Sequence, residues 1–305
     1  MSTELNINAL MPQEMAEKAE WIGVRKAGMT FFPLFALSIL AGAFIALGGL
    51  FATTVYAGSS ALPYGVARLL MGLGFCLGLI LVVVGGAELF TGNNLIVMAW
   101  ASRKVNTAGL LRNWVIVYLG NFVGALGTAV LVFLSGQYNF GNGVVGETAL
   151  KIAITKSSLG FTEAVALGIL CNGLVCLAVW LTYSARSTTD KILAILFPIT
   201  AFVAASFEHS VANMYFIPYA LLIKAFDPAF ALAHGLELSS LGWTAFFLKN
   251  LLPVTIGNII GGAGLVAIMY WFIYLNPSKV SQPQVPQSIP PYLDVGEGTT
   301  IEMHS

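Results

Sequence analysis

Charged residues are scarce in this chain. Lysine, arginine, aspartate and glutamate together make up 9% of its 305 residues, whereas hydrophobic residues make up 57%. A soluble domain typically carries about 25% charged residues, so this chain cannot cover its surface with polar groups. Its 14 basic and 14 acidic residues balance, which gives no reason to expect a nucleic-acid partner. We therefore expect an integral membrane protein whose outer surface faces lipid.

Motifs that hold metals, cofactors or nucleophiles are also missing. The three cysteines, Cys76, Cys171 and Cys176, lie in apolar runs and form no CxxC pair, so neither a disulfide nor a metal or redox site is expected. The sequence has no HExxH zinc motif, no GxSxG elbow and no P-loop. It therefore predicts no metal, no cofactor and no enzymatic activity.

Long apolar runs, by contrast, are abundant. A helix needs about 20 apolar residues to cross the hydrocarbon core of a bilayer, and six regions meet this requirement. Four have the length of one span, but the second and fifth are too long for one span and too short for two. The six predicted regions are 31–55, 65–100, 111–135, 162–184, 192–224 and 252–275.

Both long regions are interrupted by polar residues. The second contains GGAELFTGNN (85–94), and the fifth contains SFEHSVAN (206–213). Polar backbone at membrane depth is tolerated only where it is buried in protein or lines a wet cavity. Broken helices at corresponding places in two halves of a chain are typical of a transport site.

The two halves of the chain share a pattern of polar residues and glycines. The corresponding positions are Glu88 and Glu208, Asn93 and Asn213, and the runs LRNWVIVYLGNFVG (111–124) and LKNLLPVTIGNIIG (248–261). The GxxxG spacing in both runs allows close helix packing, and their asparagines, Asn121 and Asn258, are expected to hydrogen-bond across helices. Because each half has three spans, the halves must be inverted relative to each other. We predict inverted repeats at about 31–135 and 162–275, each with a broken middle helix.

Basic residues predict the orientation. The loops after the second and fourth regions share one side with both ends of the chain, and that side carries nine of the 14 basic residues: Lys18, Arg25, Lys26, Arg103, Lys104, Arg112, Arg186, Lys191 and Lys279. Because Lys and Arg favour cytoplasmic loops, both termini are expected in the cytoplasm.

The segments outside the predicted channel domain, 31–276, differ from each other. Residues 1–30 predict an amphipathic helix, which lies along the cytoplasmic membrane surface or packs on the underside of the protein. Its apolar positions at helical spacing are Met11, Met15, Ala19 and Ile22. Residues 277–305 are rich in proline, which predicts a disordered cytoplasmic tail.

A few polar residues inside the spans are candidates for function. His209 is the only histidine in a predicted span; it either serves an anion as hydrogen-bond or proton donor, or ties the helix break to a neighbour. Glu88 and Glu208 are carboxylates at membrane depth, where function is the default expectation. Their symmetry favours a structural role, in which they accept backbone N–H groups and fix the interrupted segments. Asn172 either hydrogen-bonds between helices or serves as a hydrogen-bond donor in the pore.

Four stretches together resemble the formate/nitrite transporter family, and within it the bacterial formate-conducting members. These are MPQEMAEKAE, AELFTGNN, FEHSVANMYFIP and LLPVTIGNIIGG, and the resemblance covers about residues 8–276. It implies an aquaporin-like protomer with its own pore, assembly as a homopentamer, and location in the bacterial cytoplasmic membrane. The substrates it implies are small monovalent anions such as formate, nitrite and hydrosulfide.

The resemblance also implies roles for individual residues. His209 would lie at the middle of the pore, Thr91 and Asn172 would be polar lining residues, and Lys156 would attract anions near the external mouth. Glu88, Glu208, Asn93 and Asn213 would fix the two interrupted loops. The apolar constrictions would be formed by Phe75, Leu79, Phe90, Val175 and Phe202.

These residues suggest a mechanism and leave alternatives open. Moving an anion through an apolar ring is expensive, and a proton received near His209 would remove the charge where desolvation is worst. Passive and proton-coupled passage both remain open, as do formate, nitrite and hydrosulfide. An aquaporin-type channel is a weaker alternative because paired Asn-Pro-Ala motifs are missing. An intramembrane enzyme using Glu208 and His209 lacks further ligands or a nucleophile.

Overall fold

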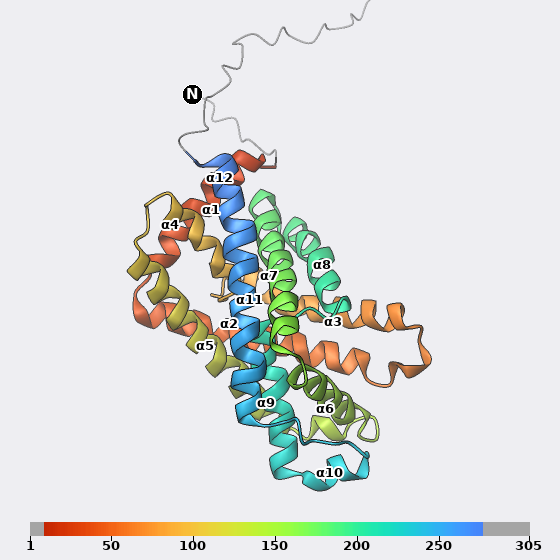
Figure 1. Ribbon diagram of the computed structural model, residues 1–305. Coiled ribbons are helices and arrows are strands. Elements are labelled where there is room, and N and C mark those ends of the chain that lie inside the picture. The colour runs from red at the N-terminus through yellow and green to blue at the C-terminus, as the bar shows by residue number, and fades with distance from the viewer. Residues whose placement is uncertain (1–8, 277–305) are drawn as a thin grey trace, which may run out of the picture.

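The computed structural model describes residues 9–276, and every regular element in that range is helical. Figure 1 shows an elongated helical bundle. Helices α1 (Pro12–Ala27) and α12 (Met269–Tyr274) lie at one end, and α6 (Val144–Ser157) and α10 (Pro228–Ala233) lie toward the other. The two ends of the described chain therefore lie on the same side of the bundle. The tail predicted at 277–305 lies outside the described residues.

Five helical stretches are long and apolar enough to cross a membrane, judged by length and composition. They are α2 (Phe31–Tyr56), α3 (Tyr64–Gly85), α5 (Thr107–Leu134), α7 (Phe161–Ser184) and the last stretch, Ala245–Tyr274. In the most apolar 18 residues of each stretch, only 39% to 56% is buried inside the chain. Their remaining apolar faces need lipid or a neighbouring subunit to cover them.

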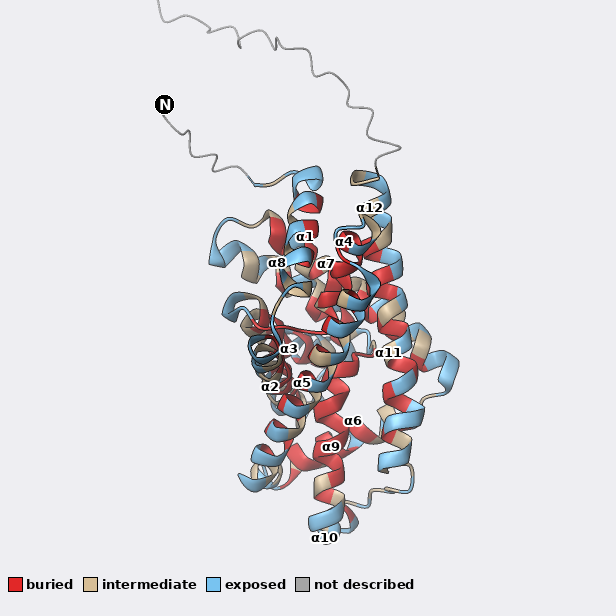
Figure 2. Ribbon diagram, turned by 90° about the vertical axis from the view of Figure 1, so that its left-hand side faces the viewer, coloured by how far each residue is buried: buried red, intermediate tan, exposed pale blue. Residues whose placement is uncertain are grey.

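The two long regions of the sequence are each divided in the structure. In the second region, α3 ends at Gly85, and residues 86–91 lead to η2 (Gly92–Ile96) and α4 (Val97–Ala101). In the fifth, α8 (Thr188–Ala204) and α9 (Ser210–Phe226) are separated by residues 205–209. Helices α8 and α9 have 17 residues each, so neither is among the five long stretches. Helix α9 is buried along most of its length (Figure 2).

The last apolar stretch begins earlier than the predicted residue 252. It consists of η4 (Ala245–Leu251), α11 (Leu252–Ile259), η5 (Ile260–Ile268) and α12, in which η4 and η5 have π-helical geometry. The sequence misled here because Lys249 and Asn250 suggest a polar boundary. Asn250 is instead fully buried and hydrogen-bonded inside the protein.

Glycines in the two related runs bring helices into close contact. A methyl group on Gly124 of α5 would lie 1.9 Å from the Ile39 carbonyl oxygen on α2, and one on Gly261 would lie 2.1 Å from the Ile169 carbonyl oxygen on α7. Neither position leaves room for a side chain. The close packing expected from the GxxxG spacing is therefore confirmed in both halves.

The predicted N-terminal helix is present as α1 and packs on the protein itself. Its buried residues include Met15, Ala16, Ala19 and Gly23, and they join a hydrophobic cluster with residues of η2 and α4. A methyl group on Gly23 would meet the Ala99 Cβ at 3.0 Å. Of the two placements left open by the sequence, the structure shows packing on the underside of the bundle.

Four short elements connect the long helices and were not predicted. They are η1 (Ser59–Ala61), η3 (Gln137–Asn139), α6 and α10. Helix α6 has 14 residues and carries Glu147, Lys151 and Lys156, so it is too short and too polar to be recognised as a span. It nevertheless forms part of the candidate site.

Candidate permeation site

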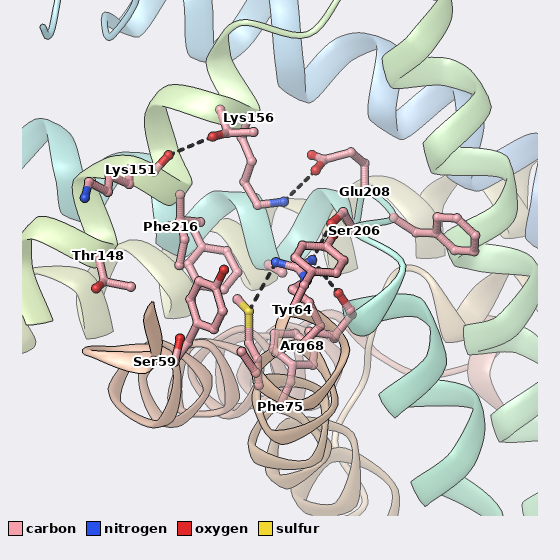
Figure 3. A pocket seen from close by; sticks show the side chains of 18 of the residues that line it. Ser59, Tyr64, Arg68, Phe75, Thr148, Lys151, Lys156, Ser206, Glu208 and Phe216 are labelled. Atoms are coloured by element: carbon pink, nitrogen blue, oxygen red, sulfur yellow. Dashed lines mark hydrogen bonds and ion pairs between the residues drawn. The ribbon is translucent and has the colours of Figure 1, made fainter. Parts of the chain in front are cut away.

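Two cavities approach the interrupted segments from opposite ends of the bundle. The larger has a volume of about 790 Å³, lies beside α6 and reaches Glu208 and His209 (Figure 3). The smaller has a volume of about 250 Å³, lies beside α1 and reaches Glu88 and Leu89. We call them the α6 cavity and the α1 cavity. The interrupted segments, 86–91 and 205–209, lie at their inner ends.

Thr91 and His209 meet between these cavities. Thr91 Oγ1 lies 2.9 Å from His209 Nε2, and both side chains are buried. Each residue belongs to a different interrupted segment, so this contact joins the two halves of the chain. Two residues that are far apart in the sequence and were both predicted as polar site residues are thus in direct contact.

The hydrogen bond at His209 Nδ1 determines whether Nε2 carries the ring proton. His209 is the N-cap of α9, and its Nδ1 accepts a hydrogen bond from the Ala212 backbone N–H at 3.0 Å. A neutral imidazole has one N–H and one bare nitrogen, so the ring proton is on Nε2. Nε2 therefore donates to Thr91 Oγ1, whose own hydroxyl proton remains available to a passing acceptor.

Asn172 contacts the first interrupted segment from α7. Its Nδ2 donates to the Asn258 carbonyl oxygen at 2.7 Å and to the Thr91 carbonyl oxygen at 3.3 Å. Cys176, one turn further along α7, also donates to the Thr91 carbonyl oxygen. The structure thus gives Asn172 an interhelical role at the centre of the protein, next to the Thr91–His209 pair.

A lysine, a glutamate and an asparagine form a cluster beside each cavity. Beside the α1 cavity, Lys26 Nζ lies 3.1 Å from Glu88 Oε1, and Asn93 Nδ2 donates to Glu88 Oε2 at 2.8 Å. Lys26 also donates to Asn93 Oδ1 at 2.7 Å. The expected grouping of Glu88 with Asn93 is therefore a direct contact.

The cluster beside the α6 cavity has the same composition. Lys156 Nζ donates to Glu208 Oε1 at 2.6 Å, and Asn213 Nδ2 donates to Glu208 Oε2 at 2.7 Å. Each cluster recruits a further asparagine from the related runs: Asn113 for the first and Asn250 for the second. Both ion pairs are mostly buried, and each charge is paired with the opposite charge as burial requires.

The two carboxylates do not make the backbone contacts that were predicted for them. We expected Glu88 and Glu208 to accept backbone N–H groups, but within residues 9–276 they accept from lysine and asparagine side chains. The backbone is instead held by Asn121 and Asn258.

Asn121 and Asn258 make equivalent contacts in the two halves. Asn121 accepts from the Phe90 N–H and donates to the Glu88 carbonyl oxygen, whereas Asn258 accepts from the Ser210 N–H and donates to the Glu208 carbonyl oxygen. Both amides also donate to a neighbouring helix, at Ser38 and Gly168. The predicted hydrogen bonding across helices is therefore confirmed.

The residues expected to form apolar constrictions lie in different surroundings. Phe75 and Phe202 pack edge to face with ring centres 5.5 Å apart, and both line the α6 cavity. Leu79 lines the α1 cavity. Phe90 packs against Tyr118 and Trp114, and Val175 is buried in the core. Phe90 and Val175 line neither cavity, and the constriction role of all five residues stays a prediction.

Sequence reasoning missed four side chains that line or support this site. Lys26 was considered only for the orientation, Asn113 and Asn250 only as parts of the related runs, and Arg68, which lines the α6 cavity, was given no role. The shared Leu-basic-Asn pattern of the related runs was a usable signal for the asparagines.

Among residues 9–276, no group of three or more His, Cys, Asp or Glu side chains could hold a metal ion.

Comparison with known proteins identifies the family. A model of the family described as "Formate/nitrite transporter" matches residues 13–272, so the chain belongs to the formate/nitrite transporter family. It is a multi-pass membrane protein of a family of channels and transporters, and it is not an enzyme. These assignments agree with the resemblance seen in the sequence.

Individual relatives are similar along nearly their whole length. The "Formate channel FocA" of Escherichia coli (strain K12) is 46% identical over 280 residues, covering 90% of this chain and 98% of the relative. A "Probable formate transporter" of Methanothermobacter thermautotrophicus is 39% identical over 281 residues, covering 87% and 97%. These names describe the relatives.

Solved structures share the fold. One described as "Pentameric formate channel with formate bound" has a TM-score of 0.74 and 42% identity, covering 80% of this chain and 97% of its own. An "FNT family ion channel" has a TM-score of 0.73 and 28% identity, covering 85% and 98%.

Proposed function

We propose that this protein conducts small monovalent anions, with formate as its principal substrate, through a pore in each protomer. The proposed path runs from the α6 cavity, between Phe75 and Phe202, past His209 and Thr91, and into the α1 cavity. The observation that carries the proposal is the Thr91–His209 contact between the two cavities. The choice of formate as substrate is supported by a relative and a solved structure that are each described as a formate channel.

The protomer proposed here has six spans in two inverted repeats, at about 31–135 and 162–275, with an aquaporin-like arrangement. Helix α3 with the 86–101 segment forms the broken second span, and α8 with α9 forms the broken fifth. The equivalent Lys–Glu–Asn clusters and the equivalent contacts of Asn121 and Asn258 support this repeat.

The two clusters suit a path for anions. A bare lysine would hold an anion too tightly, whereas a bare carboxylate would repel it. In each cluster the lysine charge is balanced by a glutamate, so the anion meets ammonium N–H groups without a strong net charge. Lys156 lines the α6 cavity, and Lys26 lines the α1 cavity.

Thr91 and His209 supply the hydrogen bonds that a desolvated anion needs. Between the apolar rings an anion loses most of its water, at a cost of several kcal/mol. Because His209 Nδ1 accepts from the Ala212 N–H and Nε2–H donates to Thr91 Oγ1, the Thr91 hydroxyl proton is the donor left for the anion, and the His209 N–H polarises that hydroxyl. The amino-terminal end of α9 at Ser210 adds a favourable dipole.

The proposed assembly is a homopentamer in the bacterial cytoplasmic membrane, with both termini in the cytoplasm. The pentameric relative with formate bound supports the assembly. The many exposed apolar side chains of α2, α5 and α7 provide surface for subunit contacts and lipid. The distribution of basic residues supports the orientation.

Flux measurements in liposomes test this function. Purified protein is reconstituted at defined membrane potential, and uptake of formate, nitrite, hydrosulfide and glycerol is compared at equal concentration. We expect formate to pass fastest and glycerol no faster than into protein-free liposomes. Equal or faster passage of glycerol would contradict an anion path, and faster passage of nitrite or hydrosulfide would reassign the principal substrate.

A further inference from the structure

The two interrupted segments begin with the same backbone motif but with different residues. After α3, Gly86 has φ +77°, and the Ala87 N–H donates to the Val82 carbonyl oxygen at 2.9 Å. After α8, the equivalent residue is Ser206 with φ +61°, and the Phe207 N–H donates to the Phe202 carbonyl oxygen at 2.9 Å. Glycine adopts this left-handed conformation freely, whereas serine is strained in it. The second segment therefore needs support that the first does not.

Arg68 provides this support from α3. Its Nη2 donates to the Val203 carbonyl oxygen at 2.8 Å and also to Ser206 Oγ, and its Nε donates to the Ala204 carbonyl oxygen at 3.2 Å. The carbonyl groups at the end of a helix lack partners within the helix and favour a nearby cation. One guanidinium group thus binds the last turn of α8 and the strained residue that follows it.

The position of Arg68 connects it to the proposed path. Figure 3 shows Arg68, Ser206 and Phe75 on the same wall of the α6 cavity. Arg68 and Phe75 both lie on α3, and Phe202 lies on α8 just before the carbonyl groups that Arg68 binds. The Phe202 ring also stacks on His209 with centres 5.9 Å apart. Because Phe75 lies on α3 and Phe202 on α8, a shift of α8 relative to α3 would change the distance between these two rings.

We infer that Arg68 is a positioning residue that sets the width of the Phe75–Phe202 constriction by binding the end of α8 to α3. It acts through Phe202 and the Ser206 turn, and its nitrogen atoms are engaged by protein acceptors, with Nη1 directed to Met71 Sδ at 3.6 Å. Its role therefore differs from that of Lys156, which donates to a buried carboxylate farther along the cavity. This inference rests on the proposed function because it concerns selection between anions.

The test uses variants that separate charge from geometry. Arg68→Lys keeps the positive charge but lacks the planar fork that reaches several acceptors. Ser206→Gly removes the backbone strain, so it should reduce the need for Arg68. Wild type, both single variants, the double variant and Arg68→Met, which removes the charge, are reconstituted in liposomes. Maximal flux and half-saturating concentration are measured for formate and acetate at low and high salt.

We expect Arg68→Lys to lower the ratio of formate to acetate flux by about threefold, since a wider constriction discriminates less by size. Ser206→Gly alone should stay close to wild type, and adding it to Arg68→Lys should restore most of the ratio. If Arg68 attracts anions instead, Arg68→Lys will keep the wild-type ratio and Arg68→Met will only raise the half-saturating concentration, an effect that high salt removes. That result would overturn the inference.

Hydrogen exchange provides a readout that does not depend on transport. In Arg68→Lys the backbone amides of residues 206–209 should exchange faster than in wild type, while those of 86–89 should be unchanged. Unchanged exchange at 206–209 would contradict the proposed clamp. If wild-type protein fails to conduct formate, the proposed function fails, but the exchange result still decides whether Arg68 holds the Ser206 turn.

Discussion

Thr91 and His209 are 118 positions apart in the chain, yet Thr91 Oγ1 and His209 Nε2 lie 2.9 Å from each other. This contact joins the interrupted segments of the two halves at the centre of the bundle. His209 also caps α9 through its other ring nitrogen. The ring therefore has two separable roles, one in the structure of α9 and one toward the proposed path.

Substitutions at His209 can separate these roles. Asparagine is a good N-cap residue, so His209→Asn should keep the hydrogen bond to the Ala212 N–H. His209→Phe should lose it and reduce stability by roughly 1 kcal/mol. We expect both variants to change formate flux and its pH dependence, but only His209→Phe to lower the melting temperature in detergent. Wild-type flux and pH dependence in both would show that the ring does not act on the anion.

The Lys156–Glu208 pair should be sensitive to loss of one partner. Lys156→Met leaves the Glu208 carboxylate buried without its cation, which typically costs roughly 3 kcal/mol or more. Adding Glu208→Gln removes the unpaired charge and should recover much of the lost thermal stability. Lys151→Met, which removes an exposed lysine paired with Glu147 on the same helix, is the control and should change stability little.

Transport should respond differently from stability in these variants. The double variant Lys156→Met/Glu208→Gln should remain slow in formate flux because the ammonium donor is gone. A double variant with wild-type flux would contradict the role assigned to Lys156. A single variant Lys156→Met with wild-type stability would contradict the buried ion pair.

Close helix packing predicts a contrast between two glycines of α5. Gly124→Ala would place a methyl group 1.9 Å from the Ile39 carbonyl oxygen, so we expect a large drop in melting temperature. At Gly127 a Cβ meets no atom within 4 Å, and Gly127→Ala should be neutral or stabilising by roughly 0.5–1 kcal/mol. Equal effects at the two positions would show that α2 and α5 are not in this close contact.

Much of the arrangement could be predicted from the sequence because membranes impose strong constraints. Polar runs inside long apolar regions can persist only where they are enclosed, so segments 85–94 and 206–213 stood out as a site. The matching positions of Glu88 and Glu208 pointed to equivalent roles. The partners of these glutamates were harder to predict, because Lys26 and Lys156 come from helices outside the long spans.

Other features depend on geometry that no local pattern reveals. Helix α6 has no long apolar run, although it supplies Lys156 to the site. The left-handed conformation of Ser206 and its contact with Arg68 arise only when α8 packs on α3. The role of Asn121 and Asn258 in holding backbone groups could be foreseen in part, because both amides occupy equivalent places in the related runs.

Blocking the proposed path at Phe202 tests the central claim most directly. The described cysteines, Cys76, Cys171 and Cys176, are buried, so an anionic methanethiosulfonate reagent should leave wild-type flux unchanged. Phe202→Cys places a thiol at the α6 cavity. The control is Leu232→Cys, which lies 78% exposed on the short connecting helix α10 at the same end of the bundle (Figure 1). Mass spectrometry confirms labelling of both. We predict that labelling abolishes formate flux through Phe202→Cys and spares Leu232→Cys; undiminished flux through fully labelled Phe202→Cys would contradict a path between the two cavities.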